Sequence, residues 1–327
     1  MRWGILATGM IARKFADTVN RMAGEGEKLI AAGSRSAEKA KAFAEEFGIP
    51  KYYGSYEELA ADPDIDTVYI ASPNNLHKEH TVLCLNAGKH VLCEKPFTTN
   101  ARDAEELYEL GREKGLFVME AFWIRFLPLY DLLLKKIREN EFGALKYARC
   151  DYGFIARGAR RERKLLSELG GGALLDIGIY NLGFLHMVMG ESPDSFSSEV
   201  HINEYGTDDF SAVLLKYPGG GTACTAQSIG TLMERRAALY FENATIYLPD
   251  FQGAFEMTVC PTEGEPTIIK CPADINGYEY EIREVTEKTS GGHCHSAVHT
   301  PEDSVAVLQL MDDIRASWNM KFSFEGE

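Results

Sequence analysis

The sequence predicts an α/β domain with a doubly wound parallel sheet, followed by an α+β domain built on a largely antiparallel open sheet. Up to about residue 122, short apolar runs alternate with helical patterns, which is typical of βαβ units. From residue 195 to 271, short alternating segments are separated by turns such as Pro218-Gly219-Gly220. Because 327 residues exceed what one core usually supports, we expect two domains, 1–122 and 123–327.

The first domain is expected to contain five strands with helices between them. Apolar runs bounded by turn residues predict strands at 3–7, 29–34, 67–71, 90–93 and 117–121. Helical spacing predicts helices at 11–22, 37–47, 77–86 and 101–114.

The second domain begins with a predicted helix over 128–140 and a strand over 146–154. A glycine-rich segment then leads into another helix near Leu174. A final helix over about 301–318 places Val305, Leu308 and Ile314 near helical spacing, so one of its faces is buried, and one option is that it packs back on the first domain.

Charge and cysteine content limit the classes of partner. With 34 basic and 49 acidic residues the net charge is −15, which disfavours nucleic acid and anionic membrane surfaces. Seven cysteines, odd in number and without CxxC spacing, indicate reduced thiols. No leader pattern and no apolar span of about 20 residues is apparent, so we expect a cytoplasmic protein.

A glycine-containing turn follows the first strand and opens a helix. Ala7-x-Gly9-x-x-Ala12 fits the GxGxxG/A pattern of the Rossmann pyrophosphate turn, with alanine at the first glycine. We therefore expect the segment Ala7-Thr8-Gly9-Met10-Ile11 to contact the pyrophosphate of a dinucleotide. The alternative is an ordinary tight turn between strand and helix.

The end of the second strand indicates which dinucleotide binds. NAD-binding turns usually place a carboxylate here, whereas this chain has Ser34-Arg35-Ser36. Ser34 can donate to a 2′-phosphate and Arg35 can pair with it, which favours NADP(H). The alternative makes Ser36 a helix N-cap and Arg35 a solvated residue, although capping and phosphate binding are compatible.

Polar residues also end two later strands. Ser72-Pro73-Asn74 with His77 follows one strand, and Glu94-Lys95-Pro96 ends the next. Because ligands bind beyond the carboxyl ends of strands in open α/β sheets, both segments are expected at the nicotinamide half of the site. A lone lysine such as Lys95 is, by itself, more often solvated than functional.

These motifs, together with the segment 170–178 (GGGALLDIG), resemble the Gfo/Idh/MocA oxidoreductase family along the whole chain. Within it, Tyr180 in place of a frequent histidine, the segment 119–126 and Ser34-Arg35 look most like the branch of dihydrodiol dehydrogenase and NADP-linked D-xylose dehydrogenase. The resemblance implies NADP(H), Lys95 as active-site lysine, Glu94 as a cofactor contact and a cis bond before Pro96. It also implies a tyrosine acid/base, a cyclic diol or sugar substrate and a homodimer or higher homo-oligomer.

The chemistry expected of the second domain rests on Asp176 and Tyr180. On a helix these lie at i and i+4 on one face. Tyr180 is the candidate acid/base for the substrate hydroxyl; a neighbouring Lys95 would lower its pKa, and Asp176 would orient Lys95 or a substrate hydroxyl. The alternatives are a core tyrosine with a satisfied hydroxyl and a carboxylate favoured by a helix dipole.

Three other features have more than one interpretation. Trp123 and Arg125 follow the last parallel strand and are expected beside the nicotinamide, although Arg125 could form a domain-boundary ion pair. The basic run 157–164 is either solvated or a mobile lip over the pocket. Possible zinc ligands lack structural zinc spacing, so no metal is expected; they are His293, Cys294, His295 and His299.

The sequence thus predicts an NADP-dependent oxidoreductase that moves a hydride between nicotinamide and a CH–OH carbon of a small cyclic diol, sugar or polyol. Two alternatives stay open: a non-catalytic NADP(H)-binding sensor, since a dinucleotide fold does not itself imply turnover, and an NAD-dependent glycosidase-like enzyme that recycles its cofactor.

Overall fold

The computed structural model describes residues 1–325, which form two compact units. The first contains Met1–Trp123 and Asp274–Val305, and the second contains Ile124–Ala273 and the chain from Ala306. The sequence placed everything after residue 122 in the second domain. The difference lies in 274–305, which returns to the first unit because its side chains bind partners there.

The sheet of the first unit has six parallel strands in the order β3-β2-β1-β4-β5-β6. Its strands are β1 (Arg2–Leu6), β2 (Lys28–Gly33), β3 (Lys51–Tyr53), β4 (Thr67–Ile70), β5 (His90–Glu94) and β6 (Val118–Ala121). The predicted doubly wound parallel sheet is confirmed. The strand order reverses between β1 and β4, and in open α/β sheets ligands bind beyond the carboxyl ends of the strands at such a point, where the predicted cofactor motifs lie.

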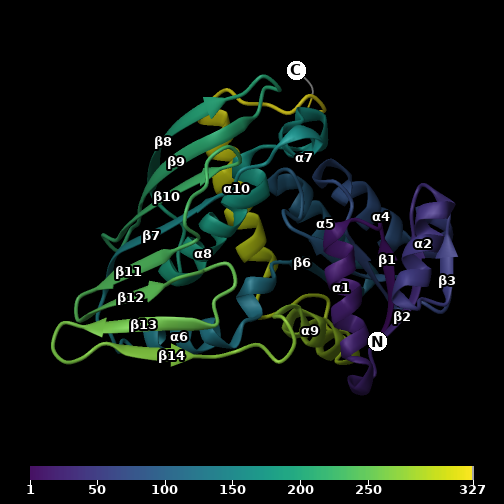
Figure 1. Cartoon of the computed structure of the whole chain (residues 1–327), viewed down its shortest axis with the longest axis horizontal. Coiled ribbons are helices and arrows are strands. Elements are labelled where there is room, and N and C mark those ends of the chain that lie inside the picture. Colours follow the sequence, from purple (N-terminus) through teal and green to yellow (C-terminus); the bar gives the residue numbers. More distant parts are fainter. Residues whose placement is uncertain (326–327) are drawn as a thin grey trace. The chain divides into compact units, whose positions relative to one another are not determined.

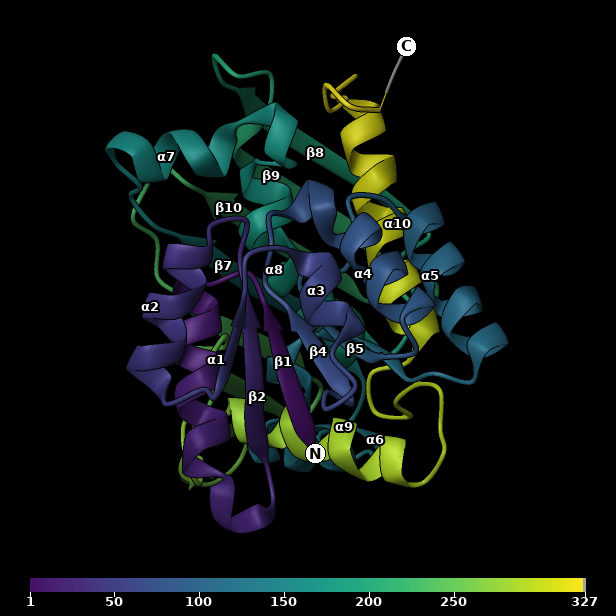
Figure 2. The same cartoon turned by 90° about the vertical axis from the view of Figure 1, so that its right-hand side faces the viewer.

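Helices cover both faces of this sheet. As Figure 2 shows, α1 (Met10–Arg21) and α2 (Ala37–Phe47) lie on one side, and α3 (Tyr56–Ala61), α4 (His77–Asn86) and α5 (Ala101–Lys114) lie on the other. Ser36 caps α2 by accepting from the amide of Lys39. Neither β3 nor α3 was predicted, because three residues of strand and six of helix are too short to show periodicity.

The returning segment carries α9 (Tyr278–Ser290), which packs on α1. Asn276 donates to the hydroxyl of Thr18 at 2.9 Å, and Arg283 forms an ion pair with Glu25 at 2.8 Å. These contacts tie the segment to the first unit.

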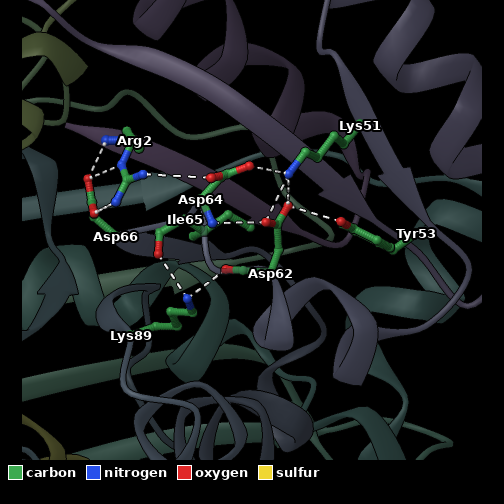
Figure 3. A network of polar contacts seen from close by, with 8 residues as sticks. All are labelled: Arg2, Lys51, Tyr53, Asp62, Asp64, Ile65, Asp66 and Lys89. Carbon is green, nitrogen blue, oxygen red and sulfur yellow. Dashed lines mark hydrogen bonds and ion pairs between the residues drawn. The ribbon is translucent and has the colours of Figure 1, made fainter.

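A polar network holds the opposite, amino-terminal edge of this sheet (Figure 3). The carboxylate of Asp62 accepts from Lys51 and from the hydroxyl of Tyr53, both at 3.0 Å, and Arg2 pairs with Asp66. Lys89 is buried and donates to the carbonyl of Asp62 at 2.7 Å. The charged residues of this network therefore have structural partners and are not part of the predicted cofactor site.

The second unit is built on an eight-stranded sheet (Figure 1) in the order β14-β13-β12-β11-β7-β10-β9-β8. Its strands are β7 (Leu145–Gly153), β8 (Ser195–Ile202), β9 (Asp208–Lys216), β10 (Thr222–Ser228), β11 (Ala237–Phe241), β12 (Ala244–Leu248), β13 (Glu256–Pro261) and β14 (Thr267–Lys270). Only β7 and β10 pair in parallel among the described strands of this sheet; the other pairs are antiparallel, which confirms the predicted class.

The helices of this unit are α6 (Pro128–Arg138), α7 (Gly158–Leu165) and α8 (Ile179–Met189), and α10 (Pro301–Ser317) belongs to it from Ala306 onward. A π-helical turn, Leu174–Gly178, leads directly into α8. The basic run 157–164 forms α7, a regular helix. Its contacts place it beside Asp176.

The stretch Ser167–Met189 is long and apolar enough to cross a membrane, although no such span was expected from the sequence. Because 78% of its most apolar window is buried inside the structure, this stretch has the character of a core helix. On the solvent side of the sheet, Phe210, Leu214 and Tyr247 are exposed.

Candidate active site

The turn between β1 and α1 has the geometry of a phosphate cradle. Ala7 has a φ of 74°, a left-handed conformation in which glycine is preferred, so the substitution noted in the motif carries backbone strain. Gly9 is the N-cap of α1, and a Cβ added to it would meet no protein atom within 4 Å. The protein's own packing therefore does not require this glycine, whereas a pyrophosphate approaching the free amides of α1 would. Thr8, Met10 and Ile11 complete the turn, with the Met10 side chain exposed.

The carboxyl end of β2 presents Ser34, which is buried, and Arg35, which is exposed. No described carboxylate forms an ion pair with Arg35. Burial raises the pKa of Tyr56, and the nearby Arg35 guanidinium opposes that rise by its charge and a hydrogen bond. Arg35 is thus oriented by a hydrogen bond with the Tyr56 hydroxyl and has no described acidic partner. Such an arginine is well suited to bind a phosphate monoester.

Tyr56 continues a chain of contacts from Arg35 toward β4. Its ring meets that of His80 edge-on at 4.7 Å, and Nδ1 of His80 lies 2.8 Å from the hydroxyl oxygen of Ser72. Burial lowers the pKa of His80 to about 4, so the ring is neutral at neutral pH. The ends of β2 and β4 are thereby linked through side chains.

His77 joins the two predicted nicotinamide-side segments. Its Nδ1 lies 2.8 Å from the carbonyl oxygen of Pro96, and its Nε2 lies 2.9 Å from that of Ser72. The ring is buried, and burial lowers its pKa. His77 therefore acts as a brace between the Ser72-Pro73-Asn74 turn and the Lys95-Pro96 turn, whose peptide bond is cis.

Glu94 and Lys95 occupy the carboxyl end of β5. Glu94 is buried, and it accepts from the hydroxyl of Tyr69 and, at 3.3 Å, from the amide of Lys95. Burial raises the pKa of Glu94. Lys95 is half-buried, and its charge opposes the rise at Glu94. The cationic side chain thus directly follows the carboxyl end of β5.

An aromatic pair follows β6. Trp123 stacks on Tyr278 of α9 with ring centroids 4.8 Å apart, and the ammonium of Lys14 lies 4.4 Å from the Tyr278 ring centroid. Arg125, two residues further along, belongs to the second unit and is half-buried. Of the two predicted cofactor contacts, Trp123 alone shares a unit with the other cofactor residues.

Two buried acidic residues of the first unit, Glu281 and Glu120, differ in their partners. Glu281 of α9 is fully buried, and neither of its carboxyl oxygens has a hydrogen-bond partner among the described residues. Burial and the charge of Glu94 raise the pKa of Glu281 well above its usual range. Glu120 is also buried but accepts from Ser304 at 2.7 Å and contacts His299 at 2.9 Å. His299 is therefore a structural partner of Glu120.

The candidate residues of the second unit lie where the π-helix becomes α8. Asp176 is part of the π-helical turn, a feature that occurs often at functional sites, and Tyr180 lies in the first turn of α8. Lys164 of α7 donates to Asp176. Tyr180 is 4% exposed. Both residues were correctly predicted to lie on a helix, although the wider π turn was not foreseen.

Three aromatic residues, Tyr152, Phe154 and Tyr180, form a ring wall. The ring centroids of Tyr152 and Tyr180 are 6.4 Å apart, and those of Tyr152 and Phe154 are 6.2 Å apart. Burial raises the pKa of Tyr152; Arg235 and a hydrogen bond with Gln252 oppose the rise, while the charge of Asp176 adds to it. Tyr152 therefore lies near both predicted catalytic residues of this unit.

The glycine run 170–172 fixes the relation between α7 and the π-helix. The amide of Gly172 donates to the carbonyl of Lys164 at 2.8 Å, and a Cβ on Gly171 would lie 2.6 Å from that oxygen. Gly172 has a φ of 119°, and a Cβ there would lie 2.5 Å from Oδ1 of Asp208. The buried Asp208 in turn accepts from the amide of Leu174 at 2.9 Å. Glycine is required at both positions by close approach.

Several residues of these two sites were not predicted, namely Tyr56, His80, Tyr152, Phe154, Arg235 and Tyr278. Tyr152 and Phe154 end a predicted strand with a spacing of two, which puts them on one face and could have identified them. The others reach these sites only through tertiary contacts, even His80, which lies in a helix that the sequence predicted. Lys95 belongs to the first unit and Tyr180 to the second, so their pairing stays a prediction.

Known proteins resemble this chain along its whole length. Residues 1–122 match the model "Oxidoreductase family, NAD-binding Rossmann fold", and residues 130–247 match the "GFO/IDH/MocA C-terminal domain". Trans-1,2-dihydrobenzene-1,2-diol dehydrogenase of Xenopus laevis is 33% identical over 321 residues, covering 95% of this chain and 96% of that protein. The human protein of the same name is 33% identical over 339 residues, covering 98% of each.

Solved structures agree with this result. An aldose-aldose oxidoreductase from Caulobacter crescentus complexed with glycerol has a TM-score of 0.87 at 25% identity, covering 98% of this chain and 97% of that one. A 3-ketoreductase from Actinomadura kijaniata in complex with NADP and TDP-benzene has a TM-score of 0.87 at 25% identity, covering 97% of both chains. The protein is thus an oxidoreductase that acts on CH–OH groups through a nicotinamide cofactor, and the chain belongs to the Gfo/Idh/MocA family.

Proposed function

We propose that the protein is an NADP-dependent dehydrogenase of a small cyclic diol or sugar, in which Tyr180 is the acid/base and Lys95 assists it. The observation that carries the cofactor preference is Arg35, which follows β2 without a described acidic partner and is steadied by Tyr56. A carboxylate at this position would repel a 2′-phosphate, whereas a guanidinium attracts it.

The residues of the first unit would hold the cofactor along the crevice edge. Gly9 and the amides of α1 would bind the pyrophosphate, and Arg35 would bind the 2′-phosphate. Glu94 and Trp123 would contact the nicotinamide half. When bound, NADP⁺ accepts a hydride from the carbinol carbon, and NADPH returns it in the reverse direction.

The residues of the second unit would accept the substrate proton and bind the substrate ring. As the carbinol carbon is oxidised, its hydroxyl proton must leave, and Tyr180 would take it as phenolate. An ammonium such as Lys95 would stabilise that phenolate. The rings of Tyr152 and Phe154, tilted by 50° to each other, supply aromatic surface against which a pyranose or cyclohexadiene ring would pack.

The names of relatives support the substrate class. The curated relatives carry the name of a diol dehydrogenase, and two structural neighbours are named as an aldose-aldose oxidoreductase and a 3-ketoreductase. The experiment is a matrix of NADP⁺ and NAD⁺ against D-xylose, D-glucose and trans-cyclohexane-1,2-diol, followed at 340 nm. We expect turnover with at least one substrate and a preference of at least about tenfold for NADP⁺, roughly 1.4 kcal/mol. Equal use of both cofactors would contradict the preference.

We further propose that two copies of the chain associate through the solvent face of the eight-stranded sheet. Phe210, Leu214 and Tyr247 expose apolar surface there, which is costly in water and typical of an interface. Sedimentation should give twice the chain mass at micromolar concentration, and Leu214→Lys should shift it to one chain mass. A monomeric parent protein would contradict the proposal.

A further inference from the structure

We propose that the substrate carries an anionic group, a carboxylate or a phosphate, which binds the cations of α7 beside Tyr180. This inference rests on the proposed function, because it specifies the substrate of the same site. The "α7 cations" are Arg160, Arg163 and Lys164 of α7, together with Arg157, its N-cap residue.

The basic segment is exceptional within this chain. Five of the eight residues 157–164 are basic, although the whole chain has a net charge of −15. Two of the five have acidic partners: Arg161 pairs with Glu204 at 2.6 Å, and Lys164 pairs with Asp176. The other three, Arg157, Arg160 and Arg163, are exposed and form no ion pair with any described carboxylate. Although the chain is acidic, these three neighbouring guanidinium groups have no acidic partner among the described residues.

Helical geometry gathers these charges on one side of α7. Arg160, Arg163 and Lys164 are spaced i, i+3 and i+4 and therefore share a face, whereas Arg161 is turned toward Glu204. The shared face meets Phe154: the guanidinium carbon of Arg160 lies 5.3 Å from its ring centroid, and the ammonium of Lys164 lies 5.4 Å from it. Two cations over one ring repel each other unless an anion is near, and Asp176 provides that anion at Lys164.

Two routes connect this face to the candidate catalytic residues, one to Tyr180 and one to Asp176. Through side chains, Phe154 contacts Tyr152, which contacts Tyr180. Through the backbone, Lys164 accepts from Gly172, whose carbonyl accepts from the amide of Asp176 at 3.0 Å. Both routes lie within the second unit. The α7 cations are therefore held at one side of the ring wall that we assign to the substrate.

The chemistry of these arginines defines the ligand. Guanidinium groups bind carboxylate and phosphate oxygens in bidentate fashion, and they do so most strongly when partly shielded from water by an aromatic ring. A neutral diol would offer Arg160 no anionic acceptor. A sugar acid, a sugar phosphate or a nucleotide-linked sugar would place its anion against Arg160 and Arg163 while its ring lies on Tyr152 and Phe154.

The experiment compares a neutral pyranose with pyranoses that carry an anionic group. D-glucose, D-glucuronate and D-glucose 6-phosphate share a ring and differ at one carbon, and UDP-glucose carries its charge on the anomeric oxygen. We expect the kcat/KM of at least one anionic member to exceed that of D-glucose at least about tenfold at low salt, with the advantage falling as salt is added. The member with the largest ratio distinguishes a carboxylate, a monoester and a diphosphate. Equal values for all four would overturn the inference while leaving the proposed function intact.

A double variant, Arg160→Gln with Arg163→Gln, tests the location of the anion site. We expect it to lower the kcat/KM of the preferred anionic substrate at least about tenfold and to leave that of D-glucose within about twofold. Arg138→Gln is the matched control, since Arg138 of α6 is an exposed arginine of the same unit without a described acidic partner. An unchanged ratio of anionic to neutral substrate in the double variant would overturn the inference.

Direct binding separates this inference from the proposed function. The NADP-loaded protein is titrated calorimetrically with D-glucuronate and D-glucose 6-phosphate, and NADPH binding is measured in parallel. Weaker anion binding in the double variant with unchanged NADPH affinity supports the anion site even if no member of the panel is turned over. An absence of turnover with both cofactors would count against the proposed function, and equal anion binding by parent and double variant would count against the anion site.

Discussion

The ammonium of Lys164 donates to the carboxylate of Asp176, four residues before Tyr180. This contact connects the basic helix α7 to the π-helical turn, and it gives Asp176 a fixed direction at the base of the ring wall. Lys164 contacts the Oδ2 atom of this carboxylate.

Asp176→Asn should lower kcat/KM about 10- to 100-fold, because the amide keeps the shape of the side chain but loses a charge-assisted hydrogen bond. NADPH affinity should stay within about twofold, because Asp176 belongs to the second unit, whereas the pyrophosphate turn and Arg35 belong to the first. Steady-state kinetics and a fluorescence titration measure the two quantities. A loss of NADPH binding equal to the loss of kcat/KM would contradict this separation.

Arg35→Ala should weaken NADPH binding about 10- to 100-fold and leave NADH binding nearly unchanged, because only NADPH carries the phosphate that the guanidinium pairs with. Arg112→Ala is the control: its side chain is 72% exposed and pairs with Glu109 on α5 of the same unit. Tyr56→Phe should give a smaller loss, since it removes only the phenol that steadies Arg35. Similar losses for NADPH and NADH in Arg35→Ala would argue against a phosphate pocket.

Much of the fold could be predicted from the sequence, because long elements repeat their apolar residues regularly. The helices α2, α4 and α5 begin and end at the predicted residues, and the five longer parallel strands lie within one or two residues of the predicted ranges. The return of 274–305 to the first unit could not be predicted. It depends on single polar pairs such as Asn276 with Thr18 and His299 with Glu120, which leave no periodic signal.

The candidate site was predictable where a backbone requirement constrains the sequence. Ala7 with its positive φ, the cis bond before Pro96 and the glycine run 170–172 mark turns that a motif can reveal. Side chains that act through tertiary contacts were not predictable. Tyr56 and His80 come from α3 and α4 and meet only in the folded chain, and the basic run becomes informative only because Arg160 and Lys164 lie against Phe154.

Asp208 should make the second unit less stable as the pH rises through the range of about 4 to 6. Burial raises its pKa from 3.8 to about 6, so between these values the folded state binds more protons than the unfolded state. Protonated Asp208 contributes its full stabilisation below pH ~4, and this contribution is lost above about pH 6. The free energy of unfolding changes by roughly 3 kcal/mol over this range. Relative to Asp208→Asn, the free energy of unfolding of the parent protein should fall over this range. Parallel pH profiles for the two proteins would contradict the assignment.

His80 should give the first unit the opposite slope over a similar range. Burial lowers its pKa from 6.5 to about 4, so the unfolded state binds more protons between these values, and stability is lost as the pH falls from about 6.5 to about 4. His80→Gln keeps a polar contact with Ser72 but does not titrate. Its unfolding free energy should therefore vary less with pH than that of the parent protein. Thermal unfolding at pH 5 and pH 7.5 measures the difference, and an equal change in both proteins would exclude His80 as the source.

Cofactor binding and proton transfer are proposed to be divided between the two units, with Lys95 and Tyr180 serving the reacting hydroxyl. This division is tested by the turnover of Lys95→Ala, Tyr180→Phe and the double variant, each also titrated with NADPH. We predict that each single variant loses about 10²- to 10⁴-fold in kcat and keeps its NADPH affinity within a few fold, and that the double variant is little worse than either. Near-normal turnover of Tyr180→Phe on a substrate that the parent protein uses would show that the proton leaves by another route.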